Sequence, residues 1–278
     1  MNDIPIEDAA VTAGAGTGRA PFAVVTGASS GIGLEIVREL VGRGFAVLGC
    51  AEDEGLSPAL APLAAAGGTI ETCRADLATY DGVEALVAAV ASRPVDALVL
   101  NAGTGVGGRF VETALADHLR TIHLDVASVV HLASRLLPAM VARGAGRVLF
   151  TASVASLMPG PYYSTYAASK SFVLSFAEAI RHELEDTGVT VTSLLPGPTE
   201  TAFFERAGME DTPVAHQRKD DPAKVAAAGV EALLAGDDEV STPSLLARSQ
   251  VAMGKVLPDR AKAAVHAALT KPSDDHSG

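Results

Sequence analysis

The sequence predicts an α/β protein with a single doubly wound domain, in which a mostly parallel central sheet is flanked by helices. Short apolar segments alternate with longer helical segments from Phe22 onward. The apolar segments are continuous runs, which is typical of parallel strands that are covered on both faces. A glycine-rich turn follows the first of these segments and opens a helix. Together these observations indicate repeated βαβ units.

Each element can be placed by its residues. Strands are expected near residues 22–26, 45–50, 69–73, 95–100, 147–152 and 189–195. Long helices are expected near 112–143 and 164–187, and a helix near Pro222 with a short strand around Val240 completes the domain. In a doubly wound sheet the ligand lies at the carboxyl ends of the strands, so the chemistry is expected there.

The chain divides into three parts by composition. Residues 1–20 are rich in Gly, Ala and Thr without periodicity, and they indicate a flexible tail. Residues 21–243 contain no interior linker and no repeat, so we expect one domain. Residues 244–278 show helical periodicity around Pro258 and end in a polar segment that we expect to be frayed.

Composition and charge exclude several classes of function. The 278 residues carry a net charge of −12 and no Trp, which argues against nucleic-acid binding. The two cysteines, Cys50 and Cys73, lack the spacing of a metal site, so no metal is expected. The acidic N-terminus is unlike a signal peptide, and we see no apolar run of about 18 residues. We therefore expect a cytoplasmic protein without a membrane partner.

The glycine-rich turn, Thr26–Gly33, reads T-G-A-S-S-G-I-G. Glycines permit a tight turn and close approach of the backbone to a pyrophosphate, and the helix N-terminus offers unpaired N–H groups. This predicts a dinucleotide site. The spacing is G-x-x-x-G-x-G rather than the common G-x-G-x-x-G. On this turn alone, the alternative of a glycine-rich turn that binds no ligand stays open.

An acidic run, Glu52-Asp53-Glu54, follows the second expected strand. Dinucleotide-binding folds often place a carboxylate there to accept hydrogen bonds from the adenosine ribose, and a carboxylate repels a 2′-phosphate. No Arg or Lys lies in this stretch. The run therefore favours NAD over NADP, with NADP left open, and its alternative is a solvated acidic loop.

Tyr166 and Lys170 are four residues apart at the start of a predicted helix, so their side chains share one face. A phenol titrates near pH 10, and its use as a base at neutral pH needs about 4 kcal/mol of help. A nearby ammonium acts in that direction. A surface lysine beside a helix-starting tyrosine is the alternative. Tyr162 and Tyr163 have no lysine at this spacing and are expected to pack or to line a cleft.

These segments together resemble the classical short-chain dehydrogenase/reductase family, from about Phe22 to Phe203. The family motifs appear in order as Thr26–Gly33, Asn101-Ala102-Gly103, Ser153, Tyr166 with Lys170, and Pro196–Thr201. The resemblance implies a Rossmann-type fold. It also implies an oxidoreductase that interconverts a secondary alcohol and a carbonyl by hydride transfer with a nicotinamide cofactor.

The resemblance also implies a role for each matched residue. Tyr166 would be the acid/base, Lys170 would bind the nicotinamide ribose and lower the pKa of the phenol, and Ser153 would orient the substrate. The cofactor would contact Gly27, Ser29, Ser30, Gly31, Ile32, Gly33, Glu52, Asp76, Leu77, Asn101, Ala102, Gly103, Tyr166, Lys170, Pro196, Gly197, Thr199 and Thr201. Residues 199–220 would form a substrate lid, in which Phe203 and Met209 are equally consistent with ordinary packing. A homodimer or homotetramer would form through the long helices.

One position departs from the family pattern. The family places a catalytic Asn in the helix before the serine strand, and this chain has Asp125 there. An ionised Asp cannot donate a hydrogen bond as Asn does, and it could pair with Lys170 through water. The alternative function is therefore a cofactor-binding regulatory or redox-sensing protein with impaired turnover.

Overall fold

The computed structural model describes residues 19–241 and 258–272. Its sheet has seven strands that are parallel throughout, in the order β3-β2-β1-β4-β5-β6-β7. The strands are β1 Phe22–Thr26, β2 Ala46–Ala51, β3 Ile70–Arg74, β4 Ala97–Leu100, β5 Gly146–Thr151, β6 Val189–Leu195 and β7 Glu239–Ser241. The predicted fold class is confirmed, because the strand order reverses between β1 and β4 as in a doubly wound sheet.

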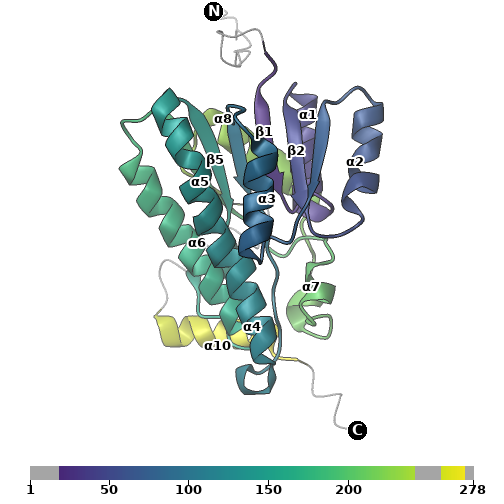
Figure 1. Cartoon of the computed structure of the whole chain (residues 1–278). Coiled ribbons are helices and arrows are strands. Elements are labelled where there is room, and N and C mark those ends of the chain that lie inside the picture. The colour runs from purple at the N-terminus through teal and green to yellow at the C-terminus, as the bar shows by residue number, and fades with distance from the viewer. Residues whose placement is uncertain (1–18, 242–257, 273–278) are drawn as a thin grey trace, which may run out of the picture.

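Helices cover both faces of the sheet (Figure 1). One face carries α1 Gly31–Gly42, α2 Leu56–Ala65 and α8 Pro222–Ala235. The other carries α3 Tyr80–Val90, α5 Ser128–Arg143 and α6 Ser164–Glu183. Each face has its own buried apolar cluster, so the strands between them are buried on both sides, as their continuous apolar runs predict.

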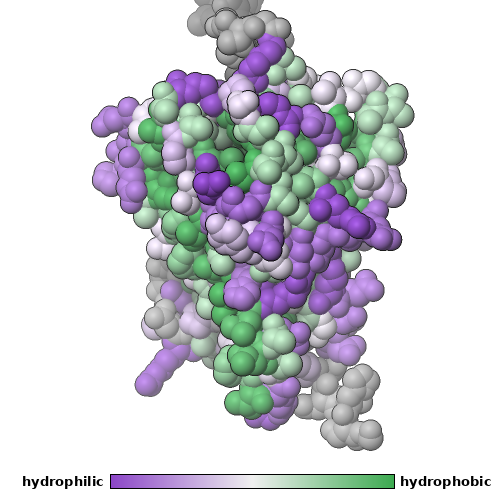
Figure 2. Space-filling view, in the orientation of Figure 1, coloured by the Kyte–Doolittle hydropathy of each residue, from purple (hydrophilic) through white to green (hydrophobic). Residues whose placement is uncertain are grey.

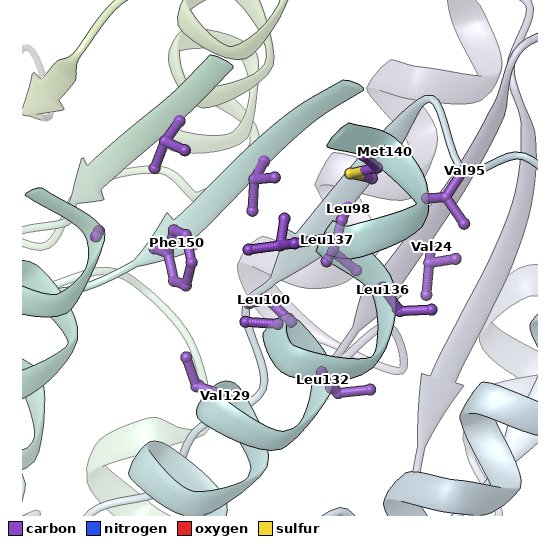
Figure 3. Close-up of a cluster of buried hydrophobic side chains, with 14 of the residues drawn as sticks. Val24, Val95, Leu98, Leu100, Val129, Leu132, Leu136, Leu137, Met140 and Phe150 are labelled. Carbon is purple, nitrogen blue, oxygen red and sulfur yellow. The ribbon is translucent and has the colours of Figure 1, made fainter. Parts of the chain in front are cut away.

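The apolar stripe of α5 shows how one helix is held on the sheet. Its buried residues recur at helical spacing, at Val129, Leu132, Leu136 and Met140. Figure 3 shows these side chains directed at Phe150 and other side chains of the central strands. Truncation of such a buried leucine to alanine costs about 2–5 kcal/mol of stability. This packing fixes the strand ends that carry the site.

Strand β3 departs from the prediction. A strand was expected at 69–73, but its side chains are not covered on both faces: Glu71 and Thr72 are exposed. The reason is position, because β3 is an edge strand that pairs only with β2. Glu71 forms an ion pair with Arg93, and charged side chains at an edge discourage pairing with another chain.

The long helix expected near 112–143 consists of three segments. Helix α4, Leu115–Ile122, continues through a π-helical turn, His123–Ala127, into α5. By length and composition the combined segment Leu115–Arg143 is apolar enough to cross a membrane. Its α5 part instead packs its apolar stripe against the sheet as a core helix.

The C-terminal region contributes α10, Asp259–Thr270, which begins directly after Pro258. This helix contacts the short helix η4, Pro213–His216, which lies within residues 199–220. The expectations for residues 1–18, 242–257 and 273–278 lie outside the described residues.

Candidate active site

One cleft runs along the carboxyl ends of strands β1 to β6. Its lining includes the glycine-rich turn after β1, Glu52 after β2, Asp76 after β3, Asn101 after β4 and Ser153 after β5. All eighteen residues expected at the cofactor line this cleft, although they come from six separate segments of the chain. Asp125 lies behind the cleft wall rather than in it.

The glycine-rich turn is shaped as a cradle that side chains would fill. Gly27 and Gly31 have φ of +69° and +54°, which favour glycine. A Cβ on Gly33 would lie 2.0 Å from the Gly27 carbonyl oxygen. Ser30, at the N-cap of α1, makes no side-chain capping hydrogen bond, so its side chain does not occupy the first N–H groups of the helix. The turn fits a pyrophosphate group.

Thr26 and Asn101 hold the turns after β1 and β4 together. The Asn101 and Ala102 N–H groups donate to Thr26 Oγ1 at 2.9 and 3.0 Å. Asn101 Nδ2 donates to the Thr26 carbonyl at 3.1 Å. The N-A-G segment therefore supports the floor of the cleft by fixing one turn against the other.

The acidic end of the cleft contains a cation that the local sequence did not indicate. Arg120, from α4, pairs with Glu52, and its Nη1 lies 3.0 Å from Asp76 Oδ2. Burial raises the pKa of Asp76, but the Arg120 and Ala78 hydrogen bonds outweigh it and leave the pKa below its ordinary value. The carboxylates at this end are therefore partly neutralised by a residue far along the chain.

Tyr166 and Lys170 lie on one face of α6 and both line the cleft, as their spacing predicts. Lys170 is buried, and its Nζ donates to the Thr151 carbonyl at 3.1 Å. The same Nζ is 5.8 Å from the centroid of the Tyr166 ring. The alternative of a surface lysine is excluded by this burial.

The proton affinity of Tyr166 differs from the expectation. Burial and the Asp125 carboxylate raise the pKa of the phenol well above its ordinary value, and the hydrogen bond with Ser153 only partly offsets them. Lys170 does not produce the expected lowering, because its ammonium is directed at Asp125 and Thr151. Without a bound cofactor the phenol therefore holds its proton and is a proton donor.

Asp125 sits in the π-helical turn and is fully buried. Its Oδ1 accepts a hydrogen bond from the Thr104 N–H at 2.8 Å, and its Oδ2 lies 3.6 Å from Lys170 Nζ without a hydrogen-bond partner. Burial raises the pKa of Asp125, and Lys170 offsets this only in part. The pairing expected through water is thus a direct ion pair in the structure.

Ser153 combines two roles. Its hydroxyl accepts a hydrogen bond from the Ala155 N–H at 3.1 Å and caps the short helix η3, Val154–Leu157. The same side chain lines the cleft and bonds to Tyr166. Ser153 therefore both caps a short helix and lies at the cleft where the family resemblance expects it.

The lid segment contributes packing and lining at once. Helix α7, Phe203–Arg206, places the Phe203 ring 4.9 Å from the Tyr166 ring, and Phe204 and Met209 are buried at the cleft. Among the lining residues that the sequence analysis did not identify are His266 and Leu269 of α10. They belong to no local motif, and only the tertiary fold brings them to the site.

Comparison with known proteins identifies the family. A model of the short chain dehydrogenase family matches residues 21–211. The chain belongs to this family. A short-chain dehydrogenase relative, a "putative ketoacyl reductase" of Streptomyces coelicolor, is 40% identical over 184 residues, which are 64% of this chain and 70% of the relative. The expected resemblance is confirmed.

Solved structures of other members share the fold. An actinorhodin polyketide ketoreductase with NADPH is 33% identical, with a TM-score of 0.71 over 80% of this chain and 95% of that chain. A short chain dehydrogenase/reductase from Burkholderia phymatum in complex with NAD is 26% identical, with a TM-score of 0.76 over 83% and 92% of the two chains.

Proposed function

We propose that the protein is a nicotinamide-dependent dehydrogenase/reductase that interconverts a secondary alcohol and a carbonyl. One observation carries this proposal: the half-buried Tyr166 side chain lies in the same cleft as the glycine-rich turn, bonded to Ser153 and beside Lys170. A turn that binds pyrophosphate extends a dinucleotide toward the tyrosine. The neighbours that bind NAD or NADPH support this cofactor class.

The residues divide the chemistry between them. The bound cofactor supplies or accepts the hydride. In the reducing direction the Ser153 hydroxyl bonds the substrate oxygen, and Tyr166 donates the proton that this oxygen needs as its carbon is reduced. Lys170, held by Thr151, places a positive charge beside the phenol and the ribose side of the cleft. Phe203 and Met209 exclude water from the reacting carbon.

We propose reduction of a ketone as the direction. The Tyr166 phenol, whose pKa burial and Asp125 raise, carries the proton that the reduced substrate oxygen takes up. The substrate half of the cleft is mostly apolar, with Ala155, Phe204, Met209 and Val214 in its wall. These features and the relatives named as ketoacyl reductases support a ketone with an apolar body.

We propose NAD as the preferred cofactor, with NADP as the competitor. Glu52 lines the cleft where the adenosine ribose would lie, and its carboxylate repels a 2′-phosphate. The Arg120 ion pair weakens this repulsion without removing the carboxylate. Binding of NADH and NADPH, followed by fluorescence, tests the choice. NADH should bind more tightly than NADPH. Glu52→Gln should reduce the ratio of the two dissociation constants, and the control Glu54→Gln should leave this ratio unchanged. Tighter binding of NADPH by the wild type would reverse the assignment.

Turnover separates this proposal from the alternative of a regulatory protein with impaired turnover, which Asp125 favours. The test is consumption of reduced cofactor by the wild type with a panel of aliphatic, aryl and 3-ketoacyl thioester ketones. We expect at least one ketone to be reduced at a rate above 0.1 per second, an order of magnitude below the usual enzyme range of roughly 1 per second and above. Tight cofactor binding with no turnover across the panel would favour the alternative.

A further inference from the structure

Helix α10 follows residues 21–211, which match the family model, and its side chains line the active-site cleft. Its His266 is buried, and both His266 and Leu269 line the cleft. Thr270 links the helix to the neighbouring loop, because its hydroxyl proton is shared between the Pro161 carbonyl and, within the helix, the His266 carbonyl, both at 2.8 Å. The C-terminal helix is therefore part of the wall on the substrate side, next to the loop that precedes α6 (Figure 1).

The contacts of His266 fix which of its nitrogens carries the proton. Its Nδ1 lies 2.9 Å from the Pro159 carbonyl oxygen, and a carbonyl only accepts, so the proton is on Nδ1. Burial lowers the pKa of His266, so the ring is neutral and Nε2 has only a lone pair. The contact between Nε2 and the Tyr163 hydroxyl is then a hydrogen bond that Tyr163 donates.

Tyr163 is left with only acceptor capacity toward a ligand. Its one hydroxyl proton is committed to His266, and its oxygen retains lone pairs. The Tyr163 ring stacks on the Tyr166 ring at 5.8 Å, and both side chains line the cleft. Apolar side chains packed in the same cluster as Tyr163 include Ala155, Met209 and Phe204. A single fixed acceptor in an apolar wall selects one kind of ligand group.

We infer that the Tyr163–His266 pair is the polar recognition element of the substrate pocket, and that it accepts a hydrogen bond from a hydroxyl carried a few bonds from the reacting carbonyl on an otherwise apolar substrate. The inference rests on the proposed function for the position of the carbonyl at Tyr166. It adds the substrate class, a hydroxyketone, and it assigns a specificity role to a helix that the family model does not cover.

The competing explanation is that the pair only fastens α10 to the protein. Thr270 makes the comparison possible, because its hydroxyl fastens the same helix to the same loop and the residue does not line the cleft. A fastening role predicts that loss of either contact changes all ligands alike. A recognition role predicts that only Tyr163 and His266 variants change the preference between ligands.

The experiment measures binding of three ketones to the full-length protein saturated with 1,4,5,6-tetrahydro-NAD, a cofactor analogue that neither donates nor accepts a hydride, so the secondary alcohol of the hydroxy probe cannot be oxidised. A ketone cannot be reduced in this complex, so the measurement is independent of turnover. The probes are 4-phenyl-2-butanone, its 4-hydroxy derivative and its 4-methoxy derivative. The first has no second polar group, the hydroxy derivative adds a hydrogen-bond donor, and the methoxy derivative adds only a hydrogen-bond acceptor. Dissociation constants from calorimetry are compared for the wild type, Tyr163→Phe, His266→Leu and the control Thr270→Val.

We expect the wild type to bind the hydroxyketone about five-fold more tightly than the unsubstituted ketone, which is the typical net value of one hydrogen bond. Tyr163→Phe should abolish this preference, and Thr270→Val should retain it. His266→Leu frees the Tyr163 proton, so the methoxy ketone should gain affinity relative to the wild type.

Three results would overturn the inference: no preference for the hydroxyketone in the wild type, an equal loss in Tyr163→Phe and Thr270→Val, or a preference that survives in Tyr163→Phe. Circular dichroism of each variant shows whether a loss reflects unfolding, and a variant that unfolds is replaced by Tyr163→Leu under the same criteria. If the ketones bind as predicted but the enzyme with reduced cofactor turns none over, the proposed function fails while this recognition element stands.

Discussion

Three polar side chains, the buried Asp125 and Lys170 and the half-buried Tyr166, determine the proton chemistry at the scale of single residues. The ammonium of Lys170 lies between the Asp125 carboxylate and the Thr151 carbonyl. The phenol consequently keeps a raised pKa, to which Asp125 contributes after burial. The residue that departs from the family pattern is therefore expected to act on the reaction by positioning charge, without touching the substrate.

Replacement of Asp125 by Asn tests this electrostatic role. Loss of the carboxylate removes one of the causes that raise the Tyr166 pKa, so the phenol should lose its proton at a lower pH. Ketone reduction needs the protonated phenol, so its rate is retained at low pH and falls as pH rises through this pKa. In Asp125→Asn the fall should begin at a lower pH than in the wild type. The pH profile of kcat measures it.

The matched control for that profile is Asp117→Asn, an exposed carboxylate in the first turn of α4. Its profile should coincide with that of the wild type. An Asp125→Asn profile that is unchanged, or that moves to higher pH, would show that Asp125 does not set the proton affinity of Tyr166.

Residues within local motifs could be predicted from the sequence, and residues that reach the site from elsewhere could not. The turn glycines, Ser153 and the Tyr166–Lys170 pair are defined by spacing along one strand or helix, and the cleft contains them all. Arg120 and His266 meet their partners 44 to 107 residues away in the chain, through contacts that only the packed fold creates. Neither the hydrophobic periodicity nor the composition of the sequence indicates such contacts.

At the scale of elements, the turn between β1 and α1 requires glycine because backbone atoms approach closely. A methyl group on Gly33 would lie 2.0 Å from the Gly27 carbonyl, whereas one on Gly42 in the same helix would meet no atom within 4 Å. Gly33→Ala should abolish binding of NADH and NADPH. Gly42→Ala should bind as the wild type does and stabilise the fold by about 0.5–1 kcal/mol. Fluorescence titration measures cofactor binding, and thermal unfolding measures stability. Normal cofactor binding by Gly33→Ala would contradict the proposal that this turn holds the pyrophosphate.

The lid helix α7 brings a cation to the same turn. Arg206 Nη2 lies 3.5 Å from Ser30 Oγ, next to the expected pyrophosphate position. We expect Arg206→Gln to weaken binding of NADH and of ADP-ribose by about three- to ten-fold, because both carry the pyrophosphate. Binding of adenosine should not change. Arg38→Gln, an exposed arginine on α1, is the control. Equal weakening by both substitutions would indicate a general charge effect.

Two elements have features that the sequence pattern does not predict. The strand at 70–74 is identified by its residues, but its place at the sheet edge, and hence its exposure, depends on the strand order. The π-helical turn His123–Ala127 interrupts a helix that is periodic in sequence. Such turns are frequent at functional sites, and here the turn carries Asp125.

At the scale of the whole molecule, exposed apolar side chains gather on one surface. Figure 2 shows hydrophobic side chains gathered over α4. The exposed residues of α4 and α6 include Leu115, Leu119, Ile122 and Phe172, of which Leu115 is 71% exposed. A groove between the two helices is lined by Ile122, Val126 and Phe172. Such a surface favours self-association through the long helices, as the family resemblance implies.

A charge placed in this groove should dissociate the assembly. We expect the wild type to be a dimer or tetramer by light scattering, and Phe172→Glu to be monomeric or to associate at least ten-fold more weakly. The control is Tyr80→Glu, which replaces an aromatic residue on α3 that is as exposed as Leu115. It should leave the molecular mass of the assembly unchanged. A monomeric wild type at micromolar concentration would rule out this interface.

The central claim is that Tyr166 donates the proton within a complex that already holds the cofactor. The direct measurement is the single-turnover rate of ketone reduction, followed by the absorbance of the reduced cofactor, in the wild type and in Tyr166→Phe. Removal of the phenol oxygen leaves the ring packing against Phe203 and the cofactor cleft intact. We predict a rate at least 100-fold lower, as general acid catalysis requires, with the dissociation constant of NADH unchanged within about three-fold. A rate within about ten-fold of the wild type would contradict the account.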